Sequence, residues 1–125
     1  MAVAAKSKRP ARKRFQSLFR LYLGDEIALG PGKIDLLRHI AETGSISAAA
    51  RRMEMSYNRA WLLVRTMNRS FKKPLVLASR GGDRHGGAGL TLQGRQVLEL
   101  YQRVEQEFTA ATRPTRRQLL ARLRS

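Results

Sequence analysis

Hydrophobic positions recur twice with helical spacing between Ser45 and Phe71. In the first run they fall at i, i+3, i+4 and i+7, one face of a helix: Ile46, Ala49, Ala50 and Met53. In the second run they recur at intervals of 4, 3 and 4: Ala60, Val64, Met67 and Phe71. The link Glu54-Met55 is long enough only for a tight turn, with Met55 filling the gap between the helices. Ser47 and Ser56 are predicted N-caps, because a hydroxyl accepts from the free N–H groups of a first turn.

Two helices joined by so short a link are typical of a helix-turn-helix, whose second helix enters the DNA major groove. An αα-corner inside any small helical domain has the same spacing. The residues off the core stripe of the second helix favour DNA, because they are hydrogen-bonding, cationic or aromatic and none is acidic. They are Tyr57, Asn58, Arg59, Trp61, Leu62, Arg65 and Arg69.

Base recognition is predicted at the start of this helix. Arg59 in the first turn can bond guanine through two acceptors, and Asn58 can bond adenine in the same way. Arg65 is expected at base edges or phosphate, whereas Tyr57 and Trp61 fit either core packing or apolar contact with thymine and sugar. The complete predicted DNA-binding set in this motif is Ser47, Ser56, Tyr57, Asn58, Arg59, Trp61, Leu62 and Arg65.

The segments before the motif predict a hairpin and a further helix. Residues 18–29 alternate apolar and polar positions around Gly24-Asp25, which indicates a short β-hairpin, although a short helix could use the same apolar run. A helix is expected from Lys33 to Glu42, with Gly44 as its C-terminal stop. Its buried side is predicted to be Ile34, Leu37, Ile40 and Ala41.

The segment after the motif predicts a wing, that is, two strands joined by a loop. Leu75 to Ala78 and Leu90 to Leu92 are strand-sized, and the loop from Arg80 to Gly89 is glycine-rich and basic. Such a loop suits close backbone approach to phosphate or a narrow groove, so Arg80, Arg84 and His85 join the predicted DNA contacts. Nucleotide-binding fingerprints fail here, because the lysine and hydroxyl positions of a phosphate loop hold Ala88 and Gly89.

A last helix is predicted from Gln93 to Ala110, with Thr91 as its cap. Its apolar stripe is too wide for one domain to cover, so these residues are expected to form a homodimer interface: Val97, Leu100, Tyr101, Val104 and Phe108. Residues 111–125 could continue as a frayed helix, although Pro114 and the positive charge oppose order.

The composition indicates that the protein binds a polyanion. The net charge is +16, and 11 of the 25 basic residues lie in two acid-free tails, 1–14 and 111–125. We expect a basic arm (1–14), one DNA-binding domain (15–110) and a basic tail (111–125). Solvated tails that only maintain solubility are the alternative. There is no cysteine, and we expect no metal, no cofactor, no catalytic residue and no membrane segment, with the protein on the nucleoid in the cytoplasm.

Several motifs resemble one family. Gly44-Ser45-Ile46-Ser47, Ala49-Ala50, Met53 and Met55-Ser56 are similar to the helix-turn-helix of LysR-type regulators. Ser56-Tyr57-Asn58-Arg59-Ala60-Trp61, Met67-Asn68, the wing and Leu90-Thr91 resemble the molybdate-responsive ModE regulators more specifically. The resemblance covers residues 18–110. It implies a winged helix-turn-helix, a homodimer through the last helix and a palindromic operator. The family's C-terminal molybdate-binding domains are not expected in this chain, so no effector is implied.

The expected fold is therefore α+β and mostly helical: a winged helix-turn-helix with an N-terminal β-hairpin and a C-terminal dimerisation helix. The expected function is sequence-specific regulation of transcription through double-stranded DNA, with no enzyme activity. A nucleoid-architectural protein of low sequence specificity is one alternative. A small oxyanion-binding protein that uses the basic wing is another.

Overall fold

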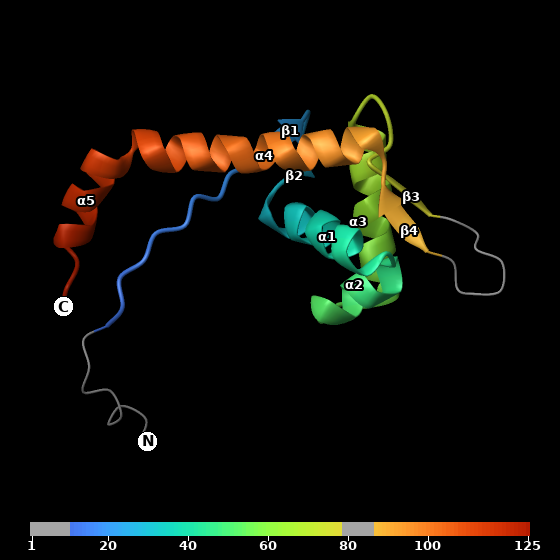
Figure 1. The fold of residues 1–125 in the computed structure, drawn as a ribbon, viewed down its shortest axis with the longest axis horizontal. Helices are drawn as coiled ribbons and strands as arrows, with labels where there is room; N and C mark the ends of the chain where they lie inside the picture. Colours follow the sequence, from blue (N-terminus) through green and yellow to red (C-terminus); the bar gives the residue numbers. More distant parts are fainter. Residues whose placement is uncertain (1–10, 79–86) are drawn as a thin grey trace, which may run out of the picture.

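The computed structural model describes residues 11–78 and 87–125. The elements in chain order are β1 (Leu21–Leu23), β2 (Glu26–Leu29), α1 (Pro31–Thr43), α2 (Ile46–Arg52), α3 (Tyr57–Ser70), β3 (Val76–Ala78), β4 (Ala88–Leu90), α4 (Leu92–Ala111) and α5 (Arg113–Ala121). Helices α1 to α3 form a bundle below one half of the long helix α4, and the β3–β4 pair projects from one side (Figure 1). This confirms the predicted α+β, mostly helical winged helix-turn-helix.

Helix α1 is the centre of the core. It contacts α2, α3, α4, β2 and β4, and four of its side chains are buried: Ile34, Leu36, Leu37 and Ile40. Leu36 was not among the predicted buried residues, and Ala41, which was, is exposed. The difference follows from α1 lying between α4 on one side and α2 and α3 on the other, so its apolar face is wider than one stripe. Gly44 ends α1 with a φ of 73°, as predicted for a glycine C-cap.

The helix-turn-helix is formed by α2 and α3, and one of its two predicted caps is wrong. Ser45 caps α2, because its Oγ accepts from the backbone N–H of Ala48 at 3.0 Å. Ser47 lies inside the first turn, and its Oγ accepts from Arg51 Nη1 at 3.4 Å. Both serines lie at the start of the apolar run, so the sequence spacing does not distinguish them. Ser45 is the cap because its backbone is in the β region, as an N-cap requires, whereas Ser47 is already inside the helix. The predicted cap Ser56 is confirmed, since its Oγ accepts from Arg59 N at 3.1 Å.

The turn between α2 and α3 bends sharply at one residue. Glu54 has a φ of 55°, the left-handed conformation that non-glycine residues adopt uncommonly. The backbone of the next residue is held against the end of α2, because Met55 N donates to Ala50 O at 3.0 Å. Met55 then packs against the core, as predicted, and fills the space between the two helices.

The predicted N-terminal hairpin is confirmed. Strands β1 and β2 are antiparallel, with a bulge at Leu21/Tyr22 and a turn in which Gly24 has a φ of 64°. The segment before β1 is held against α4 by Phe19, whose ring stacks on Tyr101 with centroids 4.0 Å apart. Tyr101 Oη also donates to Phe19 O at 2.6 Å. Burial raises the pKa of the Tyr101 hydroxyl, because the phenolate would be desolvated.

The two wing strands are antiparallel, with Val76 paired to Leu90 and Ala78 to Ala88. The second strand therefore ends before Thr91, two residues earlier than predicted. Thr91 caps α4, as predicted, because its Oγ1 accepts from Gly94 N at 2.9 Å, and Leu92 begins the helix. The predicted contacts Arg80, Arg84 and His85 lie outside the described residues.

Asn68 joins α3 to the wing, a role the sequence pattern did not indicate. Its side-chain oxygen accepts from Leu75 N at 2.8 Å and from Val76 N at 3.1 Å. Its side-chain nitrogen donates to Val76 O at 3.0 Å. One side chain therefore fixes both the start of β3 and its direction.

Helix α4 extends beyond the bundle, and α5 bends away at its far end (Figure 1). Residues 113–121 are helical, so the tail predicted for 111–125 contains an ordered helix that begins with Pro114 in its first turn. Proline is tolerated there because the first-turn N–H groups have no helical partner. Among the residues the structure describes, no helix is long and apolar enough to span a membrane.

We predict that Gly94→Ala destabilises the fold, because an alanine Cβ would lie 2.2 Å from Leu75 O. Helix α4 would have to move away from the wing, and overpacking of this kind costs about 1–3 kcal/mol. Gly32→Ala in α1 is the matched control, since its Cβ would meet nothing within 4 Å; it should be neutral or stabilising by roughly 0.5–1 kcal/mol. Urea denaturation measures both, and equal midpoints for the two variants would contradict the packing.

We also predict that Asn68→Ala lowers the free energy of unfolding by about 1–3 kcal/mol, since it leaves backbone groups of β3 without partners. Asn58→Ala on the same helix should change stability by less than ~0.5 kcal/mol, because Asn58 is exposed. Thermal melts monitored by circular dichroism compare the pair. Hydrogen exchange at Val76 N should accelerate only in the Asn68 variant, and unchanged protection there would show that Asn68 does not hold the wing.

Candidate DNA-binding interface

Helix α3 presents a polar stripe directly opposite its buried one. The buried positions Ala60, Val64 and Met67 are fully enclosed, and Phe71 after the helix end is half-buried. Two residues before each of these positions lies an exposed residue, so a second 4-3-4 stripe faces solvent: Asn58, Leu62, Arg65 and Arg69. We call these four residues the outer face of α3. It combines amide, apolar and guanidinium groups, the types that contact base edges in a major groove.

Arg69 at the end of the outer face is already engaged in the fold. Its Nη2 lies 3.4 Å from Glu26 Oε2 on β2, and both side chains are exposed. An exposed pair of this kind contributes little stability. Asn58 and Leu62 carry no charge, and Arg65 forms no ion pair with any residue that the structure describes.

The aromatic residues and Arg59 lie on the flanks of α3 rather than on the outer face. Trp61 is half-buried and packs against the core, whereas Tyr57, one turn earlier, is 49% exposed. The sequence left core packing and DNA contact open for both residues. In the structure, Trp61 contributes to core packing, whereas Tyr57 remains accessible. Arg59 is exposed on the opposite flank, beside the start of α1.

Arg59 lines a basic cavity between α3, the hairpin and α1. The cavity has a volume of about 440 Å³, and its other cations are Arg20 and Lys33. Lys33 Nζ donates to Ile27 O. Burial lowers the pKa of Lys33; the nearby positive charge of Arg69 lowers it further, while Glu26 opposes the shift. Three cationic side chains thus converge next to the first turn of α3.

The predicted dimer stripe on α4 divides into buried and exposed members. Tyr101 is buried within the chain and Val97 is packed against the core, so these two already have partners in the monomer. Leu100, Val104 and Phe108 are each at least 44% exposed. Leu21, Tyr22 and Leu23 of β1 are exposed as well. The sequence periodicity could not separate these groups, because the N-terminal segment that covers Tyr101 is distant in the sequence.

No group of three histidine, cysteine or acidic side chains that could hold a metal ion occurs in the part of the chain that the structure describes. The predicted contact Ser47 is half-buried on α2, and Ser56 is exposed at the start of α3. The structure thus gathers Ser56, Tyr57, Asn58 and Leu62 around the N-terminal half of α3, with Arg65 one turn further along. It gives Ser47, Trp61 and Arg59 positions on other surfaces.

The fold is similar to that of two solved structures. A solved DNA complex of the CbnR DNA-binding domain superposes with a TM-score of 0.54 at 20% identity, covering 70% of this chain and 95% of that one. ArgP from Mycobacterium tuberculosis superposes with a TM-score of 0.50 at 19% identity, covering 69% of this chain and 30% of that one. At such identities the likeness concerns the fold.

Curated relatives are more similar in sequence. "Molybdenum transport protein ModE" of Azotobacter vinelandii is 38% identical over 96 residues, 75% of this chain and 36% of that protein. "DNA-binding transcriptional dual regulator ModE" of Escherichia coli K12 is 39% identical over 84 residues, 67% of this chain and 32% of that protein. "Molybdenum-pterin-binding protein MopB" of Rhodobacter capsulatus is 43% identical over 77 residues, 62% of this chain and 28% of that protein. The chain spans about a third of the length of these relatives.

The family model that describes the bacterial regulatory helix-turn-helix proteins of the LysR family matches residues 32–95. These residues run from α1 through the helix-turn-helix and the wing to the first turn of α4. The match covers more than half of the chain and includes all four residues of the outer face of α3. The chain therefore belongs to the LysR family of bacterial regulatory helix-turn-helix proteins.

Proposed function

We propose that the protein regulates transcription by binding a palindromic operator as a homodimer, with the outer face of α3 in the major groove. The observation that carries this proposal is the exposed, acid-free stripe Asn58, Leu62 and Arg65, held rigidly opposite the buried stripe of the same helix. Rigid presentation favours sequence recognition, because a base contact requires a fixed side-chain position. The net charge of +16 supplies affinity for phosphate.

Arg59, Arg20 and Lys33 are proposed as phosphate contacts beside the groove. They converge on one cavity at the edge of α3, on a flank rather than on the outer face. Phosphate contacts position a protein on the duplex, and base contacts provide specificity. Arg65 and Asn58 are therefore the proposed base contacts. For Arg59 we now propose a phosphate contact that positions the protein, in place of the base contact expected from the sequence. Tyr57, Leu62 and Ser56 complete the proposed interface, with Ser47, Trp61 and the wing residues Arg80, Arg84 and His85 as more peripheral members.

A role in molybdenum homeostasis is part of the proposal. The relatives from A. vinelandii and R. capsulatus are named for molybdenum transport and molybdenum–pterin binding. We propose that the genes controlled by this protein serve the same element, that it acts on the nucleoid in the cytoplasm, and that it is not an enzyme. We assign it no effector and no cofactor.

The dimer is proposed to form through antiparallel α4 helices. Leu100, Val104 and Phe108 are the exposed apolar residues, and Glu99 and Arg103 lie with Leu100 around a shallow hollow of about 270 Å³. Glu99 and Arg103 are equally far from Tyr101 on opposite sides. A two-fold axis that passes the exposed side of α4 at the level of Tyr101, whose own side chain is buried, would therefore place Glu99 of each copy at the level of Arg103 of the other.

Two other functions are favoured by particular observations. The basic tails suit a nucleoid-architectural protein of low specificity, and the cations around the Arg59 cavity suit a small oxyanion. A ratio near one between affinities for selected and random DNA would support the first. Calorimetric binding of molybdate to the DNA-free protein, lost in Lys33→Ala, would support the second.

We predict that Arg65→Ala weakens binding to a selected operator by about 1–3 kcal/mol, and weakens binding to scrambled DNA much less, because a bidentate base contact is lost. Arg59→Ala should weaken both by the same factor and flatten the slope of log K against log salt by ~0.9. Fluorescence anisotropy on both DNAs at several salt concentrations measures this. The opposite assignment, with Arg59→Ala changing specificity and Arg65→Ala not, would show that the flank rather than the outer face contacts bases.

We predict that Glu99→Arg and Arg103→Glu each weaken the dimer, because each places like charges against each other twice. The double variant should restore it, since the pairs re-form with reversed sign. Exposed pairs contribute about 0.2–1 kcal/mol each, so the expected change is severalfold in the dimer dissociation constant. Sedimentation equilibrium at low salt measures it. Single variants that dimerise like the wild type, or a double variant no better than either single one, would rule out the antiparallel register.

A further inference from the structure

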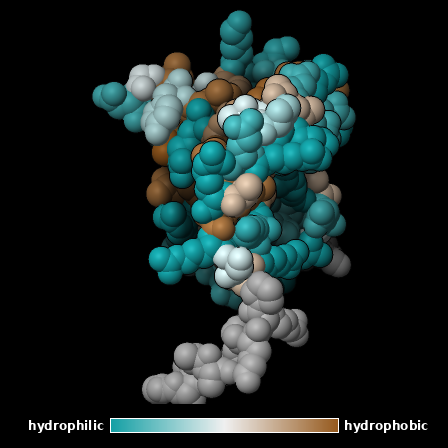
Figure 2. Space-filling view, turned by 90° about the vertical axis from the view of Figure 1, so that its left-hand side faces the viewer, coloured by the Kyte–Doolittle hydropathy of each residue, from teal (hydrophilic) through white to brown (hydrophobic). Residues whose placement is uncertain are grey.

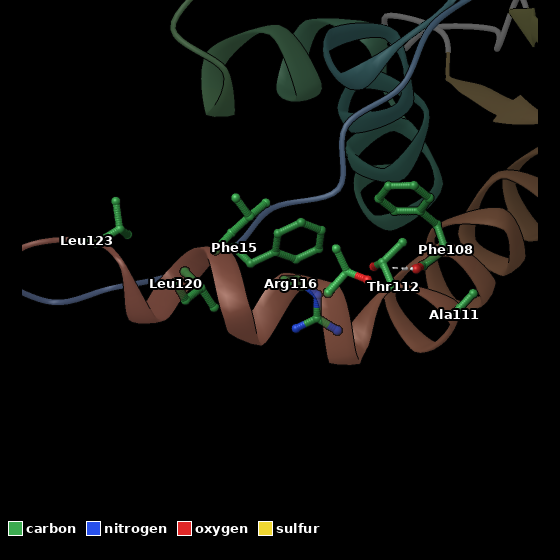
Figure 3. A pocket seen from close by; sticks show the side chains of 9 residues that line it. Phe15, Phe108, Ala111, Thr112, Arg116, Leu120 and Leu123 are labelled. Carbon is green, nitrogen blue, oxygen red and sulfur yellow. Dashed lines mark hydrogen bonds between the residues drawn. The ribbon is translucent and has the colours of Figure 1, made fainter.

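An apolar groove runs along α5 at the end of the molecule opposite the wing. It has a volume of about 530 Å³ and is walled by the end of α4, by α5 and by the segment around Phe15. Figure 3 shows its lining, with the Phe15 and Phe108 rings on neighbouring elements, Leu120 on α5 and Leu123 just beyond the end of that helix. The two rings are stacked with centroids 6.3 Å apart.

The groove is built by specific contacts rather than by loose chain ends. The guanidinium carbon of Arg116 lies 4.5 Å from the centroid of the Phe15 ring, a cation–π contact. Arg116 Nη2 also donates to Thr109 O at 2.5 Å. Thr112 Oγ1 accepts no cap bond, but donates to Phe108 O at 2.7 Å at the bend between the helices. These contacts fix the angle between α4 and α5 and keep the groove open.

Helix α5 exposes apolar side chains in the part of the chain that the structure describes. None of its nine residues is buried; Leu119 on the helix is 67% exposed, and Leu123, two residues beyond the helix end, is 53% exposed. Figure 2 looks towards this end of the molecule and shows apolar side chains interrupting a mainly hydrophilic surface. An isolated helix of this length is marginal in water, and clustered exposed apolar residues mark interaction sites. The groove is therefore a surface that another molecule can cover.

Charge selects the kind of molecule. No acidic residue follows Glu107, whereas five arginines lie between Arg113 and Arg124. A second copy would bring the same five arginines against these, and residues 1–14 of this chain are also basic and acid-free. Like charges placed together are destabilising, so neither is a suitable occupant. DNA would satisfy the arginines but not the leucines.

Shape selects a helix. The groove is open and follows the length of α5, about 13 Å at 1.5 Å per residue. Arg116 is among its lining residues, and Arg113 and Arg117 are exposed on the same helix. Small-molecule sites are more enclosed and have polar groups that converge on the ligand. An amphipathic helix that places its apolar face in a hydrophobic groove is a recurring mode of recognition. We propose that the α4–α5 groove binds an acidic amphipathic helix of a partner protein, with leucine-type side chains in the groove and carboxylates against Arg113 and Arg117.

This inference goes beyond the proposed DNA-binding function. Phe108 belongs both to the proposed dimer interface and to the groove lining, so the test variant changes only Leu119 and Leu123, which are not part of that interface. The outer face of α3 and the groove lie on different parts of the molecule (Figure 1), so one surface can be tested while the other is intact.

The test uses a labelled synthetic peptide of about four helical turns, with leucines at i, i+3 and i+7 and glutamates on the other face. Fluorescence anisotropy with the full chain should give a Kd of about 1–100 µM, typical of weak association. Leu119→Ala/Leu123→Ala should weaken binding at least tenfold, whereas Leu77→Ala, which removes an equally exposed leucine (60%) from β3, should not. Peptides with lysine for glutamate, or serine for leucine, should not bind.

Three outcomes would overturn the proposal. Equal binding to the wild type and the double variant would show that only charge attracts the peptide. Binding of the lysine peptide would refute the complementarity of charge. A dimer that dissociates in Leu119→Ala/Leu123→Ala, measured by sedimentation, would show that a second copy covers the groove. Circular dichroism is the control for folding of the double variant. Both leucines are exposed, so the variant should retain the helical signal of the wild type. Operator affinity unchanged in the double variant would separate this result from any failure of DNA binding.

Discussion

The close packing of α2 against α3 determines the geometry of the DNA-binding surface. Ala49, Ala50 and Ala60 meet at this contact and are at most 2% exposed. Their small side chains let the two helix backbones approach, and the interaxial distance depends on the residues at the contact. With the buried side of α3 fixed against α1 and α2, the opposite side must face outward. The direction of Asn58, Leu62 and Arg65 is thus a consequence of core packing rather than of any contact they make themselves.

The wing and the long helix depend on the same core through single contacts. Asn68 ties the start of β3 to α3 with three hydrogen bonds, and Gly94 lets the first turn of α4 approach Leu75 O. Ala88 N donates to Gly44 O at 2.9 Å, which joins the second wing strand to the end of α1. Helix α3, the wing strands and α4 therefore form one framework, so the spacing between the proposed DNA contacts follows from packing inside the chain.

Local patterns were sufficient to predict most elements. Helical periodicity located α1, α2, α3 and α4, Gly24 marked the hairpin turn, and Ser56 and Thr91 were recognisable as caps. What required the structure was long-range. Tyr101 looks like a surface residue of an apolar stripe until Phe19, far away in sequence, stacks on it. Arg59 lies in the first turn of α3, where base contact is expected, but only the position of the hairpin and α1 reveals that it points to a flank. The sequence predicted Ser47 as the cap of α2, and the structure has Ser45. Both serines precede apolar residues, and only the backbone conformation distinguishes them.

We propose that the outer face of α3 recognises sequence within a two-fold symmetric dimer. Methylation interference on DNA fragments selected by the protein from a random pool is a direct test, because methylated guanine N7 blocks contacts in the major groove. We expect two related patches of interference on one face of the duplex, separated by whole helical turns of ~34–36 Å, and loss of guanine interference within each patch in Arg65→Ala. Selected fragments that share no sequence, or interference that is uniform along the duplex, would contradict it.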